Sequence, residues 1–68
     1  MRKEVYLVNE EANTFFAIAR AGTTLQQRWG CLGDDGQHGH IDCISVVQAD
    51  FLFDSRVERK LKRGYAHG

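Results

Sequence analysis

One stretch in the middle of the chain carries the clearest structural signal. It reads Arg28-Trp29-Gly30-Cys31-Leu32-Gly33-Asp34-Asp35-Gly36-Gln37. The stretch continues a loosely alternating segment that starts at residue 24. Its Gly-Asp-Asp-Gly centre is typical of a hairpin loop, because glycine adopts positive φ angles without steric cost. We therefore expect a strand over about residues 24–32, a loop at 33–37 and a further strand over about residues 38–43.

Two more strands are predicted on the N-terminal side of this stretch. Aromatic and β-branched residues are concentrated over residues 14–20, and a short apolar run covers residues 4–8. The polar segment 9–13 separates these two runs, and Ala21-Gly22-Thr23 is a tight-turn signal before the next strand. Short connections of this kind join antiparallel neighbours, so we expect a four-stranded antiparallel β-meander.

Residues 46–63, on the C-terminal side, carry the pattern of a long helix. Ser45 and Gln48 fit a capping box, in which each side chain accepts a hydrogen bond from a free backbone amide. One apolar stripe recurs at helical spacing and consists of Ala49, Phe53, Val57 and Leu61, with Val46 one turn earlier. Gly64 is expected to end the helix. The predicted fold is a single α+β domain over residues 1–68, with the helix packed on one face of the meander.

Length and composition exclude several classes of protein. The chain has 68 residues, of which 43% are hydrophobic and 26% charged, and these are ordinary values for a folded domain. Its two cysteines are too few for the disulfide scaffold of a small secreted protein. No apolar run approaches the roughly 20 residues that span a bilayer, and Met1-Arg2-Lys3-Glu4 is unlike the start of a signal peptide. We therefore expect a cytoplasmic protein that does not associate with membranes.

The formal net charge is zero, with nine basic and nine acidic residues, but the two signs are segregated along the chain. Residues 31–54 contain five Asp and no Lys or Arg, whereas residues 55–68 contain five Lys or Arg and one Glu. One part of the surface can therefore be basic although the whole chain is neutral.

The stretch at residues 28–37 resembles the signature of the WGR domain, a small α+β module of eukaryotic poly(ADP-ribose) polymerases and of short bacterial proteins. Three further elements of the family pattern occur along the chain in the family's order. Asn13-Thr14-Phe15-Phe16 is similar to its Asn-x-Phe-aromatic element, Ala49 takes the place of a small helical residue, and residues 60–65 are similar to its Lys-Gly-Tyr ending. The resemblance covers nearly the whole chain, and it implies that Tyr65 folds back onto the sheet.

This resemblance implies a non-catalytic module that binds nucleic acid, in particular a DNA end. In the family the tryptophan packs on a sugar at the DNA end, and arginine and lysine side chains meet the phosphates. The matching positions assign stacking to Trp29 and a phosphate contact to Arg28, and the flat, rigid indole suits stacking. The alternatives are a Trp29 that simply covers the sheet and an Arg28 that is a solvated strand residue.

The chain also departs from the family pattern. Cys31 replaces the arginine that normally follows Trp-Gly, and Gly39 and Ile41 stand where the family usually carries lysines. Asp34 and Asp35 in the intervening loop would repel a phosphate chain. These departures favour an alternative function, namely a protein-interaction or homodimerisation module that has lost the DNA-binding face.

The predicted helix carries two further candidate surfaces. The first is a set of basic residues that share one face by their spacing: Arg56, Arg59, Lys60 and Arg63. They form either a solvated face or a stripe that contacts phosphate or an acidic partner. The second surface is Val47 with Phe51, which lie one turn apart and off the apolar stripe. This pair indicates a dimer or partner surface, unless the sheet curls round to cover it.

Signals for metal binding and catalysis are weaker. Cys31, His38, His40 and Cys43 are residue types that zinc prefers, but their spacing differs from that of zinc fingers and ribbons. Two solvent-facing histidines, a core Cys43 and a semi-exposed Cys31 are the favoured interpretation. No nucleophile with a spaced histidine and acid, and no phosphate-binding loop, is recognisable. We expect no metal, no other cofactor and no enzymatic activity, and the candidate partners are DNA and a protein partner or second copy.

Overall fold

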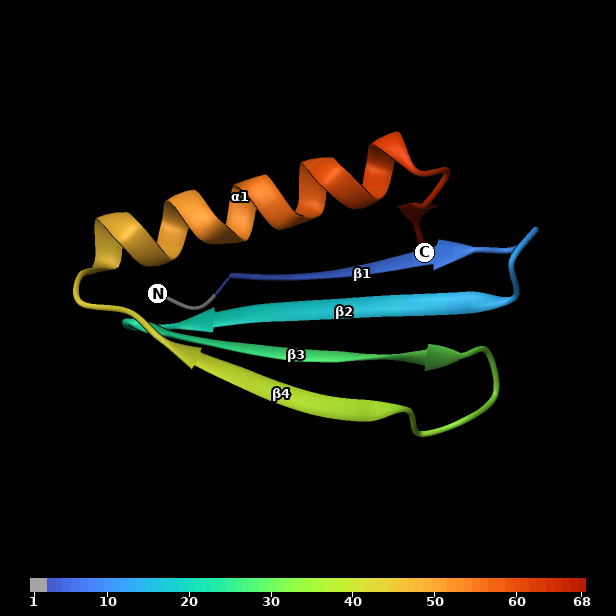
Figure 1. The fold of residues 1–68 in the computed structure, drawn as a ribbon, viewed down its shortest axis with the longest axis horizontal. Helices are drawn as coiled ribbons and strands as arrows, with labels where there is room; N and C mark the ends of the chain where they lie inside the picture. Colours follow the sequence, from blue (N-terminus) through green and yellow to red (C-terminus); the bar gives the residue numbers. More distant parts are fainter. Residues whose placement is uncertain (1–2) are drawn as a thin grey trace.

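Five antiparallel strands form one sheet, with a helix on one face, in the computed structural model, which describes residues 3–68 (Figure 1). The elements are β1 (Lys3–Asn9), β2 (Thr14–Ala21), β3 (Thr24–Cys31), β4 (Gln37–Asp42), α1 (Val46–Lys62) and β5 (Ala66–His67). The sheet order is β4-β3-β2-β1-β5, and each neighbouring pair is antiparallel. The α+β class and the meander from β1 to β4 are as predicted.

The predicted number of four strands was wrong, because β5 adds a short fifth strand at the outer edge of β1. Its two residues pair with residues 7–8 of β1. Just beyond it, the amide of Gly68 donates a hydrogen bond of 3.0 Å to the carbonyl oxygen of Tyr6. A strand of two residues is too short to show an alternating pattern, so the sequence alone carries no signal for it.

The chain reaches β5 because α1 ends in a tight turn at Gly64, as predicted. Gly64 has a φ of +97°. The amide of Tyr65 donates to the carbonyl oxygen of Lys60 at 3.2 Å, and the amide of Gly64 donates to that of Leu61 at 3.3 Å. These two bonds make a Schellman motif, which satisfies carbonyl groups at the helix end and turns the chain back toward the sheet.

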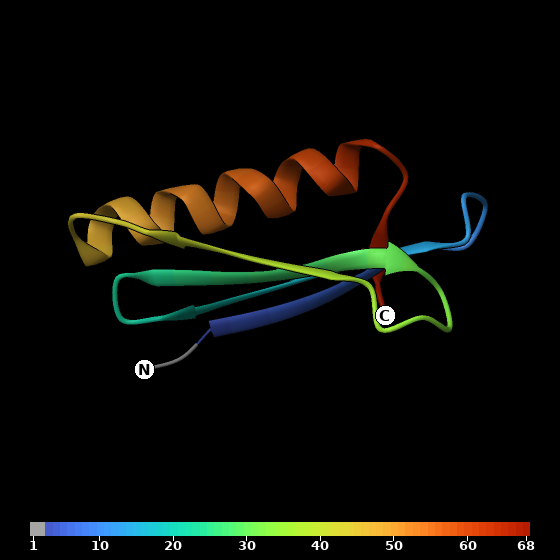
Figure 2. The same cartoon turned by 60° about the horizontal axis from the view of Figure 1, so that its bottom comes forward.

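The core lies between α1 and the sheet face that the helix covers. Alternate strand residues point to this side because side chains on a strand alternate between its two faces. The buried cluster consists of Leu7, Phe16, Ile18 and Leu25 from the sheet with Ala49 and Phe53 from α1. Ala49 is fully buried, so its small side chain lets the helix come close to the strands. Figure 2 shows that no helix of the described residues covers the opposite face of the sheet.

The predicted capping box starts α1 in a modified form, because Gln48 bonds the amide before the N-cap rather than the amide of the N-cap itself. The hydroxyl of Ser45 accepts a 3.1 Å hydrogen bond from the amide of Gln48. The side-chain oxygen of Gln48 accepts a 3.0 Å bond from the amide of Ile44, the residue before the N-cap. Two backbone donors at the helix start are thereby satisfied. Within residues 3–68, no helix is long and apolar enough to cross a membrane.

The apolar stripe predicted along α1 is correct in the middle of the helix and wrong at its ends. Phe53 is buried and Val57 packs against the core. Val46 and Leu61, in contrast, are 46% and 39% exposed. Lys60 takes the inward position in the last turn and is half-buried. A lysine can do this because its hydrocarbon stem packs on apolar groups while its ammonium group remains accessible.

The first half of α1, residues 46–54, is tied to β1 and β2 by ion pairs. Arg20 is only 8% exposed; its Nε lies 2.7 Å from Oδ1 of Asp50, and its Nη1 donates to the carbonyl oxygen of Gly22 at 3.0 Å. Lys3 Nζ lies 3.3 Å from the same oxygen of Asp50 and 3.5 Å from Asp54. The acidic side chains in this half of the helix are therefore neutralised within the fold.

Two glycines in the stretch at residues 28–37 are required by close packing. Gly36 has a φ of +80°, and a Cβ there would collide with the carbonyl oxygen of Trp29. A Cβ on Gly30 would lie 2.8 Å from the Cα of Gly36. The β3–β4 loop thus folds back tightly on the end of β3, and this packing holds the backbone that carries Trp29.

Candidate functional site

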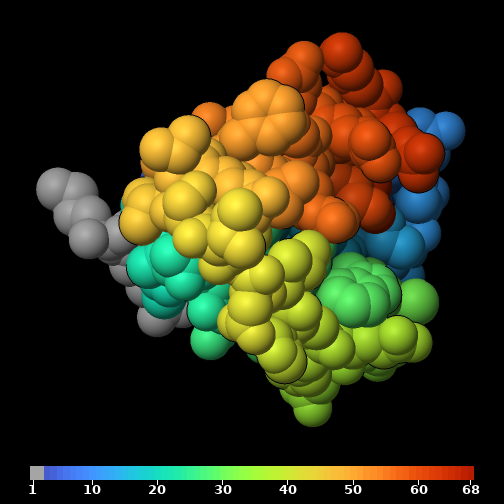
Figure 3. All heavy atoms as spheres, turned by 60° about the vertical axis from the view of Figure 1, so that its left-hand side comes forward, coloured from blue at the N-terminus to red at the C-terminus, as the bar shows by residue number. Residues whose placement is uncertain are grey.

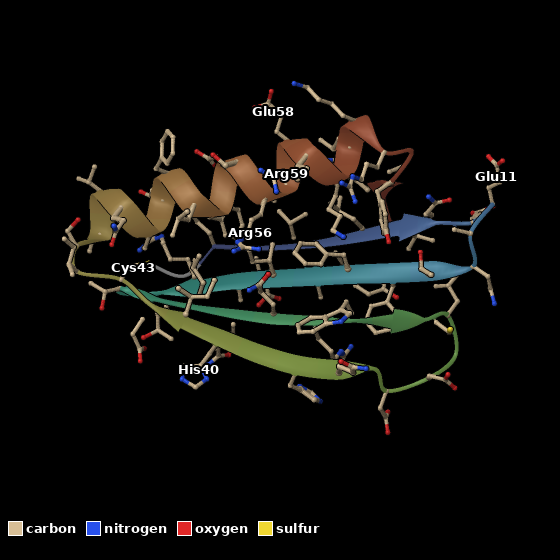
Figure 4. All side chains as sticks on the ribbon, viewed as in Figure 1. Glu11, His40, Cys43, Arg56, Glu58 and Arg59 are labelled. Carbon is tan, nitrogen blue, oxygen red and sulfur yellow. The ribbon has the colours of Figure 1, made fainter. Side chains whose placement is uncertain are left out.

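A groove runs between β3 and the second half of α1, from residue 55 to its C-cap Arg63. Seven side chains line it, and we call them the basic groove: Phe16, Gln27 and Trp29 from the sheet, and Arg56, Arg59, Lys60 and Arg63 from the helix. The groove holds a volume of about 330 Å³. Figure 4 shows Arg56 between α1 and the sheet and Arg59 in front of the helix, whereas Glu58 points away from the sheet.

Trp29 forms the sheet side of the basic groove and is 37% exposed. Its ring lies against the backbone of β4 at Gly39. A Cβ on Gly39 would be 3.2 Å from Cη2 and 3.3 Å from Cζ3 of the indole. The missing side chain at Gly39 therefore makes room for the ring, which covers part of the sheet and still presents surface to the groove.

The three arginines of the basic groove carry charges that the described part of the chain leaves without a carboxylate. All three are exposed. Within residues 3–68, no Asp or Glu oxygen lies within 4.0 Å of the guanidinium groups of Arg56, Arg59 or Arg63. Their charges are therefore available to an anion.

The fourth cation, Lys60, is held in place by two aromatic rings. Its Nζ lies 5.0 Å from the ring centroid of Phe16 and 5.2 Å from that of Tyr65. The hydroxyl of Tyr65 lies 2.9 Å from Thr14 Oγ1, within hydrogen-bond distance. Tyr65 thus returns to the sheet as expected, and it positions a lysine charge at the groove.

Arg28 lies on the opposite face of the sheet from Trp29, because adjacent residues of a strand point to opposite faces. Its guanidinium group lies 5.4 Å from the ring centroid of Phe15, and Tyr6 stacks on the same ring at 5.8 Å. Arg28 and Trp29 therefore belong to two different surfaces. A phosphate contact of Arg28 stays a prediction.

The pair proposed as a partner surface lies on the outer side of α1. Val47 is 79% exposed and Phe51 is 70% exposed, so the sheet does not curl round to cover them. Ile44, just before the helix, is 91% exposed. None of these three residues lines the basic groove. The use of this surface by a partner stays a prediction.

The cysteines, the histidines and the acidic loop lie outside the basic groove. Cys31 is exposed at the end of β3, and Cys43 is half-buried against the core. In the part of the chain that the structure describes, no group of three or more His, Cys, Asp or Glu side chains is arranged to hold a metal ion. Asp34 and Asp35 are exposed in the β3–β4 loop, and neither lines the groove.

Two residues of the basic groove, Gln27 and Phe16, were not among the predicted site residues. Gln27 shares the strand face of Trp29 because the two are two residues apart, and this signal was present in the sequence. Phe16 is the cross-strand neighbour of Trp29 in the pairing of β2 with β3. Its place in the groove depends on the pairing register, which the structure supplies.

Comparison with known proteins agrees with this architecture. The family model described as the WGR domain matches residues 3–68. No curated protein matches the chain. A crystal structure of a protein from Bacteroides fragilis, a structural genomics target, has a TM-score of 0.85 and 25% sequence identity. That match covers 100% of this chain and 19% of the other, so this chain spans about a fifth of that protein's length.

The family match includes all five strands, the helix and the Trp-Gly stretch. WGR domains are in general nucleic-acid-binding modules rather than catalytic ones. The resemblance seen in residues 28–37 is thereby confirmed, and the chain belongs to the WGR domain family.

Proposed function

We propose that this chain binds the end of a DNA duplex through the basic groove. The observation that carries the proposal is the composition of that groove. One exposed indole and four cationic side chains line it together, and no acidic side chain among residues 3–68 does. Trp29 packs on the terminal nucleotide, and Arg56, Arg59 and Arg63 meet phosphate oxygens.

The spacing of the arginines supports a contact with one phosphate chain. Residues 56 and 63 are seven apart on α1, which corresponds to about 10 Å along the helix axis. With α1 aligned along the duplex axis, this span equals the axial rise of about three nucleotides of one strand, at about 3.4 Å each. Arginine also suits the task because its planar fork can hold two phosphate oxygens at once.

The exposed indole supports a duplex end over a site inside the duplex. Base–aromatic stacking needs a nucleotide with a free flat face. Within a duplex each base is stacked on both sides, so the terminal nucleotide is the one that offers such a face without disruption of the helix. A single strand offers free faces along its whole length, and the test below therefore includes one.

The departures from the family pattern leave the basic groove intact. Gly39 makes room for the indole of Trp29, and Ile41 packs against the core. Asp34 and Asp35 lie outside the groove lining. These placements support nucleic-acid binding over the alternative of a module that has lost its DNA face.

The test compares DNA forms at low salt. Three labelled probes are titrated with the protein and followed by anisotropy: a short duplex with two free ends, a closed duplex of the same length with a hairpin loop at each end, and a single strand. We expect the open duplex to bind most tightly. The logarithm of its association constant should fall with the logarithm of salt concentration with a slope of about −3, one unit for each neutralised phosphate.

Trp29→Ala serves as the decisive variant. We expect it to weaken binding of the open duplex by about 1–3 kcal/mol, the range measured for stacking of one base. Equal affinity for the open and the closed duplex would show that the basic groove does not recognise a duplex end. Absence of affinity at low salt, or an unchanged affinity in Trp29→Ala, would show that the basic groove is not a DNA site.

A further inference from the structure

A hollow lies on the sheet face that α1 does not cover. Figure 3 shows the side chains of α1, drawn in yellow to red, gathered on one side of β3 and β4, drawn in green to yellow-green. The hollow on the opposite face has a volume of about 500 Å³, which is in the range of sites for small ligands. We call it the open-face trough, and the side chains that line it from this face are Glu4, Tyr6, Ala17, Ala19, Gln26, Arg28 and His38.

The strand register arranges this lining in two rows across the sheet. The first row consists of Tyr6, Ala17, Arg28 and His38. The second row consists of Glu4, Ala19 and Gln26. In each row the position on β2 is an alanine, whereas longer side chains stand on β1 and β3. The floor of the trough is therefore low along β2, and its two walls are two strand spacings apart, about 10 Å.

One end of the open-face trough is built on Phe15. The ring of Tyr6 stacks on it with 5.8 Å between centroids, and the guanidinium group of Arg28 lies 5.4 Å from the same ring. Phe15 itself is only 3% exposed and does not line the trough. Tyr6 therefore turns toward the trough the ring face that points away from Phe15. One aromatic face and one cation are held in position on opposite walls before any ligand binds.

The charge of Arg28 is available to an anion. Within residues 3–68, no Asp or Glu oxygen lies within 4.0 Å of its guanidinium group. Its cross-strand neighbour His38 is exposed and supplies a further nitrogen donor. The acidic residue of the lining, Glu4, lies on the opposite wall and in the other row. The β3 side of the trough thus suits a phosphate group, which arginine holds with two parallel hydrogen bonds.

We propose that the open-face trough binds an unpaired nucleotide, with its base on Tyr6 and its phosphate on Arg28. The base stacks on the available face of the Tyr6 ring, above the methyl groups of Ala17 and Ala19. The ribose spans the trough, and the phosphate oxygens accept hydrogen bonds from Arg28. A glutamine amide matches the donor and acceptor of adenine, so the presence of Gln26 on the same wall makes adenine the expected base.

This ligand differs from the DNA end proposed for the basic groove. A base inside a duplex is covered on both faces and cannot lie on Tyr6 without leaving the stack. Trp29 and Arg59 line the basic groove, and neither lines the open-face trough. The nucleotide can come as a free monophosphate or as one residue of a single strand, and both sources offer the same base and phosphate.

The first experiment maps the binding face by NMR of the isotope-labelled protein. Adenosine monophosphate (AMP), ribose 5-phosphate and a short single strand of deoxyadenosine are titrated separately up to the millimolar range. We expect AMP to shift the amide signals of Ala17, Ala19 and Arg28 and to leave those of residues 56–63 unchanged. Ribose 5-phosphate should bind at least about tenfold more weakly, because it has no base to stack.

The arms of this titration distinguish the two sources. Binding of the strand with little binding of AMP identifies a single strand as the source, and the reverse identifies the free nucleotide. Absence of shifts with both ligands would overturn the proposal, as would shifts confined to Trp29 and residues 56–63. Equal affinity for AMP and ribose 5-phosphate would exclude stacking of a base on Tyr6.

The second experiment uses matched variants of the two faces. Arg28→Gln should raise the dissociation constant of AMP about tenfold, because a charge-assisted contact with phosphate is lost. Arg59→Gln removes the same charge from the basic groove and should leave AMP binding unchanged, as should Trp29→Ala. Failure of the DNA-end proposal would therefore leave this test intact. Equal losses in Arg28→Gln and Arg59→Gln would overturn the assignment of the phosphate.

Ala17→Leu tests the trough without removing a polar group. The new side chain fills the floor between the two walls, and it points away from the core because position 17 faces the uncovered side. We expect it to weaken AMP binding at least about tenfold, and circular dichroism establishes that the variant is folded. Unchanged AMP affinity in a folded Ala17→Leu variant would show that the nucleotide does not bind in the open-face trough.

Discussion

The two halves of α1 use their charges in opposite ways. In the first half, Asp50 and Asp54 are paired with Arg20 and Lys3 from the sheet. In the second half, Arg56, Arg59 and Arg63 line the basic groove without a carboxylate partner among the described residues. The acidic charges of the first half are therefore paired within the fold, whereas the basic charges of the second half are available to a ligand.

This difference explains how a chain of zero net charge can present a basic surface. Charges of both signs are equal in number, but Asp50 and Asp54 are held in pairs with Arg20 and Lys3. The three arginines of the basic groove have no carboxylate partner among the described residues. The surface potential depends on which charges remain unpaired and where they gather, rather than on the sum over the chain.

The largest effect is expected on stability, when one charge of the ion pairs in the first half is removed. In Asp50→Asn the nearly buried Arg20 loses its closest carboxylate, so we expect the free energy of unfolding to fall by about 2 kcal/mol. Urea unfolding followed by circular dichroism measures this. DNA affinity at native conditions should not fall, because Asp50 does not line the basic groove.

Asp54→Asn is the matched control for Asp50→Asn. Asp54 is 71% exposed and lies 3.5 Å from Lys3, so its loss should cost at most about 0.5 kcal/mol. If the two variants were equally destabilised, the pair of Asp50 with the nearly buried Arg20 would not be the contact that stabilises the first half of the helix.

An intermediate effect is expected where one charge of the second half is removed. Arg59→Ala should weaken binding of the open duplex by about 1 kcal/mol and reduce the salt dependence of binding by about one unit of slope. The free energy of unfolding should stay nearly constant, because no carboxylate of the described residues pairs with Arg59. Anisotropy titrations at several salt concentrations measure both binding quantities.

Arg28→Ala removes the same side chain from the opposite face of the sheet. Its affinity and salt slope should match those of the original chain if the basic groove alone meets the DNA. A loss equal to that in Arg59→Ala would instead extend the DNA contact to the uncovered face, where Arg28 lies over Phe15.

The smallest effect is expected at the exposed ion pair of the second half. Glu58 and Lys62 are 68% and 75% exposed, and a solvated pair four residues apart contributes little. Glu58→Gln should lower the free energy of unfolding by at most about 0.5 kcal/mol in the same urea experiment. A loss above about 1 kcal/mol would show that this half, too, depends on ion pairing for its stability.

The local elements of the fold were predictable because their causes are local. Three features each depend on residues within one turn or one strand: the bond that the Gln48 amide donates to the Ser45 hydroxyl, the stop at Gly64 and the four long strands. The fifth strand and the inward position of Lys60 were not predictable. Both depend on where the chain lands after the helix ends and on which rings lie beneath it.

The candidate site divides in the same way. The spacing of Arg56, Arg59, Lys60 and Arg63 predicted a shared face, and the groove contains all four. Strand alternation places Arg28 and Trp29 on opposite faces of the sheet, because they are adjacent residues of one strand. No local pattern could predict that Trp29 lies beside the arginine face, since Trp29 and Arg56 are 27 positions apart in the sequence.

Residue patterns alone establish the four long strands, the helix, the order of these elements, the family and the segregation of charge. Periodicity, capping and turn chemistry act over a few residues, so they can be recognised in a single sequence. Only the tertiary structure decided which faces meet, which acids are neutralised and which arginines remain open. These outcomes depend on strand register and on the packing of α1 against the sheet, which join residues that are distant in the sequence.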